Sequence, residues 1–236
     1  TSLDASVRFH SMLHVLALED ASLTDEHLVA LSDALGPNKS LGVLHLASNS
    51  FSRTGIEALA AALRQNKTIT EVYLENNGLD DDAAVVLAQM LSSTRHIGVL
   101  ALDGNAIGDV GAEALAKAIA RPHRLNTLAL DDNAIGDVGG AALGRMLEVN
   151  PTVANVHLRS NRMTSRGVLA IVSSAKHPTA AVARLLLSGN AYDPRDIAAA
   201  VMDLARTSRT LAHVDIAPYV LGHGAITTLR LLPLTQ

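Results

Sequence analysis

Residues 97–107 read Ile97-Gly98-Val99-Leu100-Ala101-Leu102-Asp103-Gly104-Asn105-Ala106-Ile107, and this spacing of aliphatic residues around one asparagine recurs along the chain. Copies of the pattern begin at Leu13, Leu41, Ile69, Ile97, Leu125 and Val153, each 28 residues apart, and then at Val182 and Leu211 after steps of 29. A fixed period of this length is the signature of a stacked repeat protein. The sequence therefore predicts about eight similar units piled along one axis.

Each repeat divides into a short strand and a helix. Leu100 and Leu102 alternate with smaller or polar residues, which is the period of a strand. The second half carries pairs of aliphatic residues four positions apart, as at Leu115 and Ile119, which form one face of a helix. Equivalent strands of successive repeats should pair in parallel, roughly 4.8 Å apart. A narrow strand beside a wider helix also predicts that the stack curves.

Two sets of polar residues have structural interpretations. One asparagine stands where each strand should end, and a buried amide there can replace ladder bonds that the turn has lost; this asparagine ladder comprises Asn49, Asn77, Asn105, Asn133, Asn161 and Asn190. Aspartates near the expected helix starts can cap free N–H groups; they are Asp25, Asp81, Asp109 and Asp137. Two glycosylation sequons, beginning at Asn38 and Asn66, fall at the same helix-to-strand turn, so repeat geometry explains them.

The pattern resembles the leucine-rich-repeat family. The period of 28–29 residues is similar to that of the ribonuclease-inhibitor-like class, in which one strand and one full helix form each repeat. The segment Asn105–Leu115 looks like that class, and Asn133–Leu143 nearly copies it. The resemblance implies a right-handed α/β solenoid, a horseshoe with a concave parallel sheet and convex helices.

The expected organisation is a single repeat domain over residues 1–236. Residues 1–12 align with the end of a preceding repeat, residues 13–221 hold eight repeats, and residues 222–236 form a C-terminal segment. Ala225–Leu232 could be a final short helix or a strand. Neither end shows the polar cap that solenoids normally have, so the chain is expected to be a fragment of a longer protein or to self-associate through its ends.

Composition and motifs exclude several classes of function. Without cysteine there is no disulfide framework, thiolate zinc site or Cys-His catalysis. The net charge of −4 argues against a dedicated nucleic-acid binder, and the apolar runs are too short to span a membrane. No phosphate-binding or nucleophile motif occurs, and the histidines lack metal-ligand spacing. We therefore expect no enzyme activity, no cofactor and no metal, in a cytoplasmic protein without nucleic-acid or membrane partners.

The candidate site is the concave face of the sheet. Carboxylates on successive strands repel one another, so their alignment suggests a partner protein with a basic surface. Tyr73 is the large aromatic residue of this patch and would be its anchor. A solvated polar face is the alternative interpretation, and Arg159 beside Asp131 could be an ordinary cross-strand pair. The proposed contact residues are Glu71, Tyr73, Glu75, Asp103, Asp131 and Asp132, with His157 and Arg159 at the edge.

The leading functional hypothesis is a non-catalytic protein-interaction scaffold, and the alternatives come from resemblances. Residues Ala62–Thr68 and Leu87–Leu91 resemble the actin-binding repeat domain of tropomodulin, although that family has fewer repeats and a closing helix. Ran-type GTPase-activating proteins share this repeat type but carry more repeats and an acidic tail. The sensor end of a nucleotide-regulated receptor, and a purely structural role, also stay open.

Overall fold

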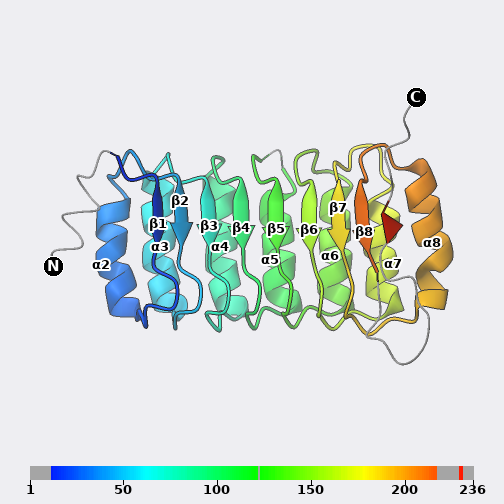
Figure 1. Ribbon diagram of the computed structural model, residues 1–236, viewed down its shortest axis with the longest axis horizontal. Coiled ribbons are helices and arrows are strands. Elements are labelled where there is room, and N and C mark those ends of the chain that lie inside the picture. The colour runs from blue at the N-terminus through cyan, green and yellow to red at the C-terminus, as the bar shows by residue number, and fades with distance from the viewer. Residues whose placement is uncertain (1–11, 122, 217–228, 231–236) are drawn as a thin grey trace.

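The computed structural model describes residues 12–121, 123–216 and 229–230, and within them strands and helices alternate from β1 to β8 (Figure 1). One sheet carries eight parallel strands in chain order, followed by a ninth, short antiparallel strand. The strands are β1 (Val15–Ala17), β2 (Val43–His45), β3 (Glu71–Tyr73), β4 (Val99–Ala101), β5 (Thr127–Ala129), β6 (Asn155–His157), β7 (Arg184–Leu186), β8 (His213–Asp215) and β9 (Leu229–Arg230). The helices are α2 (Asp25–Leu35), α3 (Arg53–Gln65), α4 (Asp81–Ser93), α5 (Asp109–Ile119), α6 (Asp137–Leu147), α7 (Ser165–Ser174) and α8 (Pro194–Thr207).

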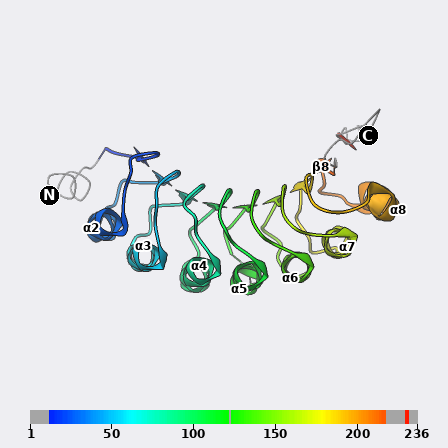
Figure 2. The ribbon, with the colours of Figure 1, turned by 90° about the horizontal axis from the view of Figure 1, so that it is seen from below.

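The register of the sheet follows the repeat period. Leu44 pairs with Leu16 on one side and with Val72 on the other, and Leu100 pairs with Leu128. Equivalent residues of successive repeats therefore stand side by side. Figure 2 shows the strands along the inner side of an arc and the helices along its outer side. The predicted α/β solenoid with a concave parallel sheet is thus confirmed.

The core is a layer of aliphatic ladders between sheet and helices. Leu44, Leu100 and Leu128 point inward from the strands and are fully buried. Leu59 and Leu115 meet them from the helices and are also fully buried. Burying one such side chain stabilises the fold by roughly 1.5–3 kcal/mol. Because leucine, isoleucine and alanine fill this thin layer, the fold needs few aromatic residues.

The asparagine ladder ties each repeat to the one before it. The Asn133 Nδ2 group donates to the carbonyls of Leu102 and Asp131, at 2.9 and 3.0 Å. Its Oδ1 atom accepts the N–H of Ile107 at 3.0 Å. One side chain therefore satisfies backbone groups of two repeats at the point where strand pairing stops.

A second asparagine column lies at the opposite end of the repeats, where helices give way to strands. Asn66 is fully buried; its Nδ2 donates to the Leu35 and Asn38 carbonyls, and its Oδ1 accepts the N–H groups of Thr68 and Ile69. Asn38 and Asn150 hold the equivalent turns. At Asn38 and Asn66 these bonds occupy the amides of the two sequons, which suits the structural interpretation.

The aspartates at the helix starts were expected to cap free N–H groups near those starts. In the structure each one caps the first turn of the following helix and not that of its own helix. Asp109 opens α5, and its Oδ1 atom accepts the N–H groups of Gly136 and Gly139 at the start of α6, both at 2.8 Å. Asp25, Asp81 and Asp137 make the same connection to the following helix. A Cβ atom at Gly139 would lie 2.8 Å from the Asp109 carboxylate and 3.0 Å from the Ala112 Cβ atom. Glycine at this position therefore permits both the bridge and the close approach of the helices.

This series of aspartate bridges has a gap. Arg53 occupies the first position of α3, where α2, α4, α5 and α6 carry aspartate. The following helix, α4, is capped instead by its own Asp80, whose Oδ1 atom accepts the Ala83 N–H at 3.1 Å. In α7 the corresponding residue is Ser165, which accepts only the Asp193 N–H, at 3.2 Å. The bridges consequently run from α2 to α3 and, without interruption, from α4 to α7.

The described residues test only part of the predicted domain ends. The C-terminal stretch Ala225–Leu232 was left open between helix and strand, and Leu229–Arg230 is a strand paired antiparallel with β8. Residues 1–11, 217–228 and 231–236 lie outside the described residues. The predicted helical tail before Met12, the end of the eighth repeat at Tyr219 and Leu221, and the remainder of the C-terminal segment fall among them.

Candidate functional site: the concave face

The structure brings the predicted contact residues onto the concave side of strands β3 to β6 and the turns that follow them. Glu71 and Tyr73 lie in β3, and His157 lies in β6. The other five residues follow strands β3 to β6; Glu75, Asp103, Asp131 and Arg159 occupy equivalent positions, and Asp132 comes directly after Asp131. All except the exposed Asp132 are half-buried. A contiguous surface therefore joins four neighbouring repeats.

An aromatic pair marks the N-terminal side of this surface. The rings of His45 and Tyr73 stack with centroids 4.3 Å apart and planes 12° from parallel. The His45 Nδ1 atom lies 3.1 Å from the Glu19 Oε1 atom, and the Tyr73 hydroxyl donates to Glu71 at 2.8 Å. Burial, and then the bond to Glu71, raises the pKa of Tyr73 to about 12. Tyr73 is thus held by two neighbours and presents a fixed face.

Sequence reasoning missed His45 and Glu19 as members of this surface. A signal was present, because His45 and Tyr73 occupy the same position of consecutive repeats and pair directly in the parallel register. In-register side chains on adjacent strands of one face are close enough to stack.

The central carboxylates have internal hydrogen bonds that the repeat pattern did not reveal. The Asp103 Oδ1 atom accepts the N–H of Asp131 at 2.6 Å, and the Asp131 Oδ1 atom accepts the N–H of Arg159 at 2.6 Å. These N–H groups lie just beyond the ends of β5 and β6. The carbonyls of the preceding repeats at this level, those of Leu102 and Leu130, already accept hydrogen bonds from the asparagine ladder. Each carboxylate thus stabilises the next repeat, which gives their alignment a structural cause as well as a possible binding role.

Charge pairing divides the patch into two parts. Arg159 Nε lies 3.0 Å from Asp131 Oδ2, so the cross-strand pair offered by the sequence is present. Burial, opposed by the Asp131 N–H and reinforced by the negative charges of Asp131 and Glu75, raises the pKa of Asp103 to about 6. Burial also raises the pKa of Glu75. The Asp132 carboxylate has no hydrogen-bond or ion-pair partner among the described residues and is exposed, so it is the most available to a ligand.

The raised pKa of Asp103 predicts a specific pH dependence of stability. The folded chain holds this proton with a pKa of about 6, against an ordinary value of 3.8. The stabilising contribution is therefore complete below pH 4 and is lost as the pH rises through 6. Replacing Asp103 with asparagine should abolish this contribution while keeping an acceptor for the Asp131 N–H. Between pH 4.5 and 7, wild type should lose on the order of 1 kcal/mol relative to Asp103→Asn, after a discount for partial exposure.

Urea unfolding of both proteins at the two pH values would measure this difference. Parallel pH profiles for wild type and Asp103→Asn would contradict the assignment of the proton to Asp103.

Neither a metal site nor a membrane-spanning helix is found in the described part of the chain. It contains no group of three or more histidine and acidic side chains placed to hold a metal ion. Its helices are also too short or too polar for a membrane span. What the concave face presents is a fixed set of hydrogen-bond acceptors, negative charges and one aromatic pair.

Comparisons with known proteins agree with this architecture. Residues 65–88, 95–116 and 123–144 match the family described as Leucine Rich repeat. Among curated proteins, none matches significantly.

Among solved structures, the chain is similar to an internalin (inlF) from Listeria monocytogenes, with a TM-score of 0.50 and 15% identity over 89% of this chain and 63% of the internalin. For an internalin C2 from the same bacterium the TM-score is 0.46 and the identity 18%, over 83% of this chain and 79% of the internalin. For the structure of leiomodin-1 actin-binding site 2 the TM-score is 0.40 and the identity 19%, over 66% of this chain and 77% of the leiomodin chain. At 15% identity the comparison with inlF shows a similar fold and nothing more. Three segments of this chain match leucine-rich repeats, in keeping with its α/β solenoid.

Proposed function

We propose that this chain is a non-catalytic protein-interaction module that binds a partner protein with a basic surface on its concave face. The observation that carries the proposal is the half-buried acidic surface around Tyr73, Glu75 and Asp103, held on a continuous parallel sheet. A surface that is already ordered loses little conformational entropy on binding. The proposed contact residues are those of the sequence analysis, with His45 and Glu19 added beside Tyr73.

The roles within this surface differ. Tyr73, stacked on His45, supplies a rigid aromatic anchor near its edge. Asp132 and Glu71 supply negative charge. In Asp103 and Asp131, one carboxylate oxygen already accepts a hydrogen bond from a backbone N–H group. Basic side chains of a partner should therefore meet Asp132 and Glu71 most directly, with the carboxylates between them adding to the field.

The finer repeat class is also part of this proposal. The helices of the described repeats contain between 10 and 14 residues. A full helix in every repeat supports the ribonuclease-inhibitor-like class, whose repeats combine one strand with one such helix.

Reversal of two charges should separate recognition from folding. Asp132→Lys with Glu71→Lys should weaken capture of the partner at least about tenfold, because both positions change from attraction to repulsion of a basic surface. The bonds of Asp103 and Asp131 stay in place, so the fold should persist. Wild type and variant would be used as baits, and captured proteins would be quantified by mass spectrometry and then by titration of the purified partner.

The matched control is Glu26→Lys with Asp33→Lys, two exposed residues of α2 that carry the same change of charge. The control should retain the partner. Equal retention by both variants, with the fold intact, would remove the concave surface from consideration. Purified actin and a Ran-type GTPase belong in the same titrations, since binding of actin or stimulated GTP hydrolysis would favour one of the alternatives.

A further inference from the structure

Positive charge gathers at the edge of the solenoid where helices end and strands begin, which is the upper edge in Figure 1. Three successive turns, after α3, α4 and α5, contribute to it. We call this set the basic edge, and it comprises Arg64, Lys67, Arg95, Lys117, Arg121 and Arg124. Such a concentration is notable in a chain whose net charge is −4.

Local structure accounts for half of these cations. Positive side chains are favourable at helix C-termini, where carbonyls are free. Lys67 donates to the Arg64 carbonyl at 2.6 Å, and Lys117 pairs with Glu113 at 2.8 Å. Arg64 itself donates to the Ser93 hydroxyl at 3.3 Å.

The other three cations lack such an explanation. Arg95, Arg121 and Arg124 are exposed, and none has a hydrogen bond or ion pair with another side chain among the described residues. Burial, and then the positive charge of Lys67 with smaller contributions from His123 and Arg124, lowers the pKa of nearby His96. Lys67 and Arg124 therefore both lie close enough to His96 to act on it, which places positive charge from successive turns around one point of this edge.

A cavity of about 240 Å³ opens between the turns after α4 and α5, directly beneath these cations. Arg95, Lys117 and Arg121 line it, together with His123. His123 is buried and rigid; its Nδ1 atom accepts the Leu125 N–H at 3.0 Å, so its Nε2 atom donates to the Thr94 carbonyl at 2.7 Å. It thereby takes the place of the buried asparagine of the second column and forms a wall of the cavity beneath the charged side chains.

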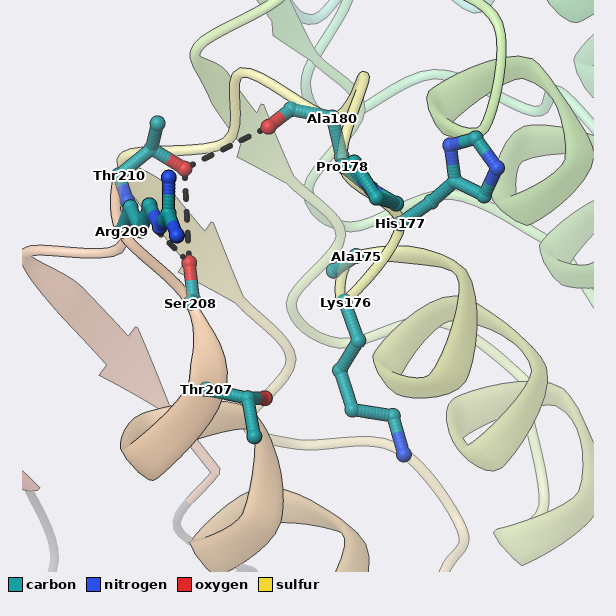
Figure 3. Close-up of a pocket in the computed structure, with 9 residues that line it drawn as sticks. All are labelled: Ala175, Lys176, His177, Pro178, Ala180, Thr207, Ser208, Arg209 and Thr210. Carbon is teal, nitrogen blue, oxygen red and sulfur yellow. Dashed lines mark hydrogen bonds between the residues drawn. The ribbon is translucent and has the colours of Figure 1, made fainter.

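A larger cavity of about 330 Å³ lies on the same edge near α7 and α8, but it is less suited to an anion (Figure 3). Lys176 is already paired with Asp203 at 3.0 Å. Figure 3 also shows Lys176 and His177 directed away from each other. The Thr210 hydroxyl donates to the Val182 carbonyl at 2.9 Å. The smaller cavity is lined by two arginines without an ion-pair partner among the described residues, Arg95 and Arg121, whereas the larger cavity is lined by one, Arg209.

We propose that the basic edge is a second docking surface, which binds an acidic, carboxylate-rich segment of a partner protein with carboxylates held by Arg95 and Arg121 at the mouth of the cavity. The planar guanidinium group binds a carboxylate through two parallel hydrogen bonds. A protein segment fits better than a long polyanion, because Glu71 and Glu113 flank the same turns and the chain as a whole is negative. None of the basic-edge residues is among the proposed contact residues of the concave face.

The test measures binding of a short, fluorescently labelled oligoglutamate peptide to the whole chain by anisotropy at low ionic strength. Wild type should bind, and Arg95→Glu with Arg121→Glu should weaken binding at least about tenfold. Arg95→Lys with Arg121→Lys should weaken it less, since charge is kept and the bidentate geometry is lost. The matched control is Arg162→Glu with Arg166→Glu, an equal charge change on two exposed residues at the opposite edge, which should change affinity less than about twofold.

Thermal unfolding would verify that all variants fold. The absence of peptide binding by wild type, or an equal loss in the control, would overturn the proposal. Tighter binding of oligothymidylate or of phosphatidylserine vesicles through the same arginines would also overturn it, in favour of a nucleic acid or a membrane. The concave variant Asp132→Lys with Glu71→Lys should bind the peptide at least as well as wild type, so failure of either proposal leaves the other standing.

Discussion

Replacing Asn133 with alanine should lower the free energy of unfolding by about 3–4 kcal/mol, among the largest effects of any single polar substitution in this chain. The side chain is 8% exposed and makes three hydrogen bonds to backbone groups. Alanine would leave the Leu102 and Asp131 carbonyls and the Ile107 N–H without this partner. Each buried polar group left unsatisfied costs about 1–3 kcal/mol, and the three costs overlap because the turn can partly relax.

Urea unfolding followed by circular dichroism would measure this effect. Asn126→Ala provides the matched control, because that side chain is exposed and bonds mainly to its neighbours Asn155 and Thr152. The control should change stability by less than about 1 kcal/mol. Equal losses of unfolding free energy in Asn133→Ala and Asn126→Ala would show that the asparagine ladder stabilises the fold no more than an exposed asparagine does.

Replacing Asp109 with alanine should cost about 2–3 kcal/mol, although the residue looks like an ordinary helix-start aspartate. Its carboxylate accepts two N–H groups of the next helix, and both would lose this acceptor. Asp109→Asn should cost only about 1 kcal/mol, because the amide oxygen can still accept while the favourable interaction with the helix dipole is lost.

The same unfolding assay applies here, with Asp33→Ala as the control on an exposed helix surface. That control should stay within about 0.5 kcal/mol of wild type. If Asp109→Ala were as mild as Asp33→Ala, the bridge between successive helices would have no energetic weight.

The fold could be predicted because one spacing rule is repeated eight times. Leu44, Leu100 and Leu128 occupy the same position of their repeats, so a single correct assignment of strand and helix propagates along the chain. The asparagine ladder could also be interpreted from its position alone. What the pattern could not show is the partner of each polar group, since Asp109 caps a helix that begins 28 residues later.

The candidate site was less accessible to sequence reasoning. The alternation of the strands predicted that Glu71, Asp103 and Asp131 share one face. In the structure Glu71 lies in β3, and Asp103 and Asp131 follow β4 and β5. The backbone bonds of Asp103 and Asp131 depend on side-chain conformation, and so does the stacking of His45 on Tyr73. The sequence alone did not show that the unpaired arginines at the turns form a cluster. Arg95 and Arg121 belong to different repeats and become neighbours only when the repeats stack.

The interrupted series of aspartate bridges has a consequence for how the array holds together. Stability in a solenoid is approximately a sum of repeat energies and nearest-neighbour interface energies, so cooperativity weakens where an interface term is smaller. Helices α4 to α7 share unbroken bridges, whereas Arg53 and Ser165 interrupt the series on either side. The flanking helices should therefore fray first, while the middle of the arc, which carries Asp103, Asp131 and Arg159, behaves as one stiff platform. The proposed contact residues in and after strands β3 to β6 would be retained through partial unfolding of both ends.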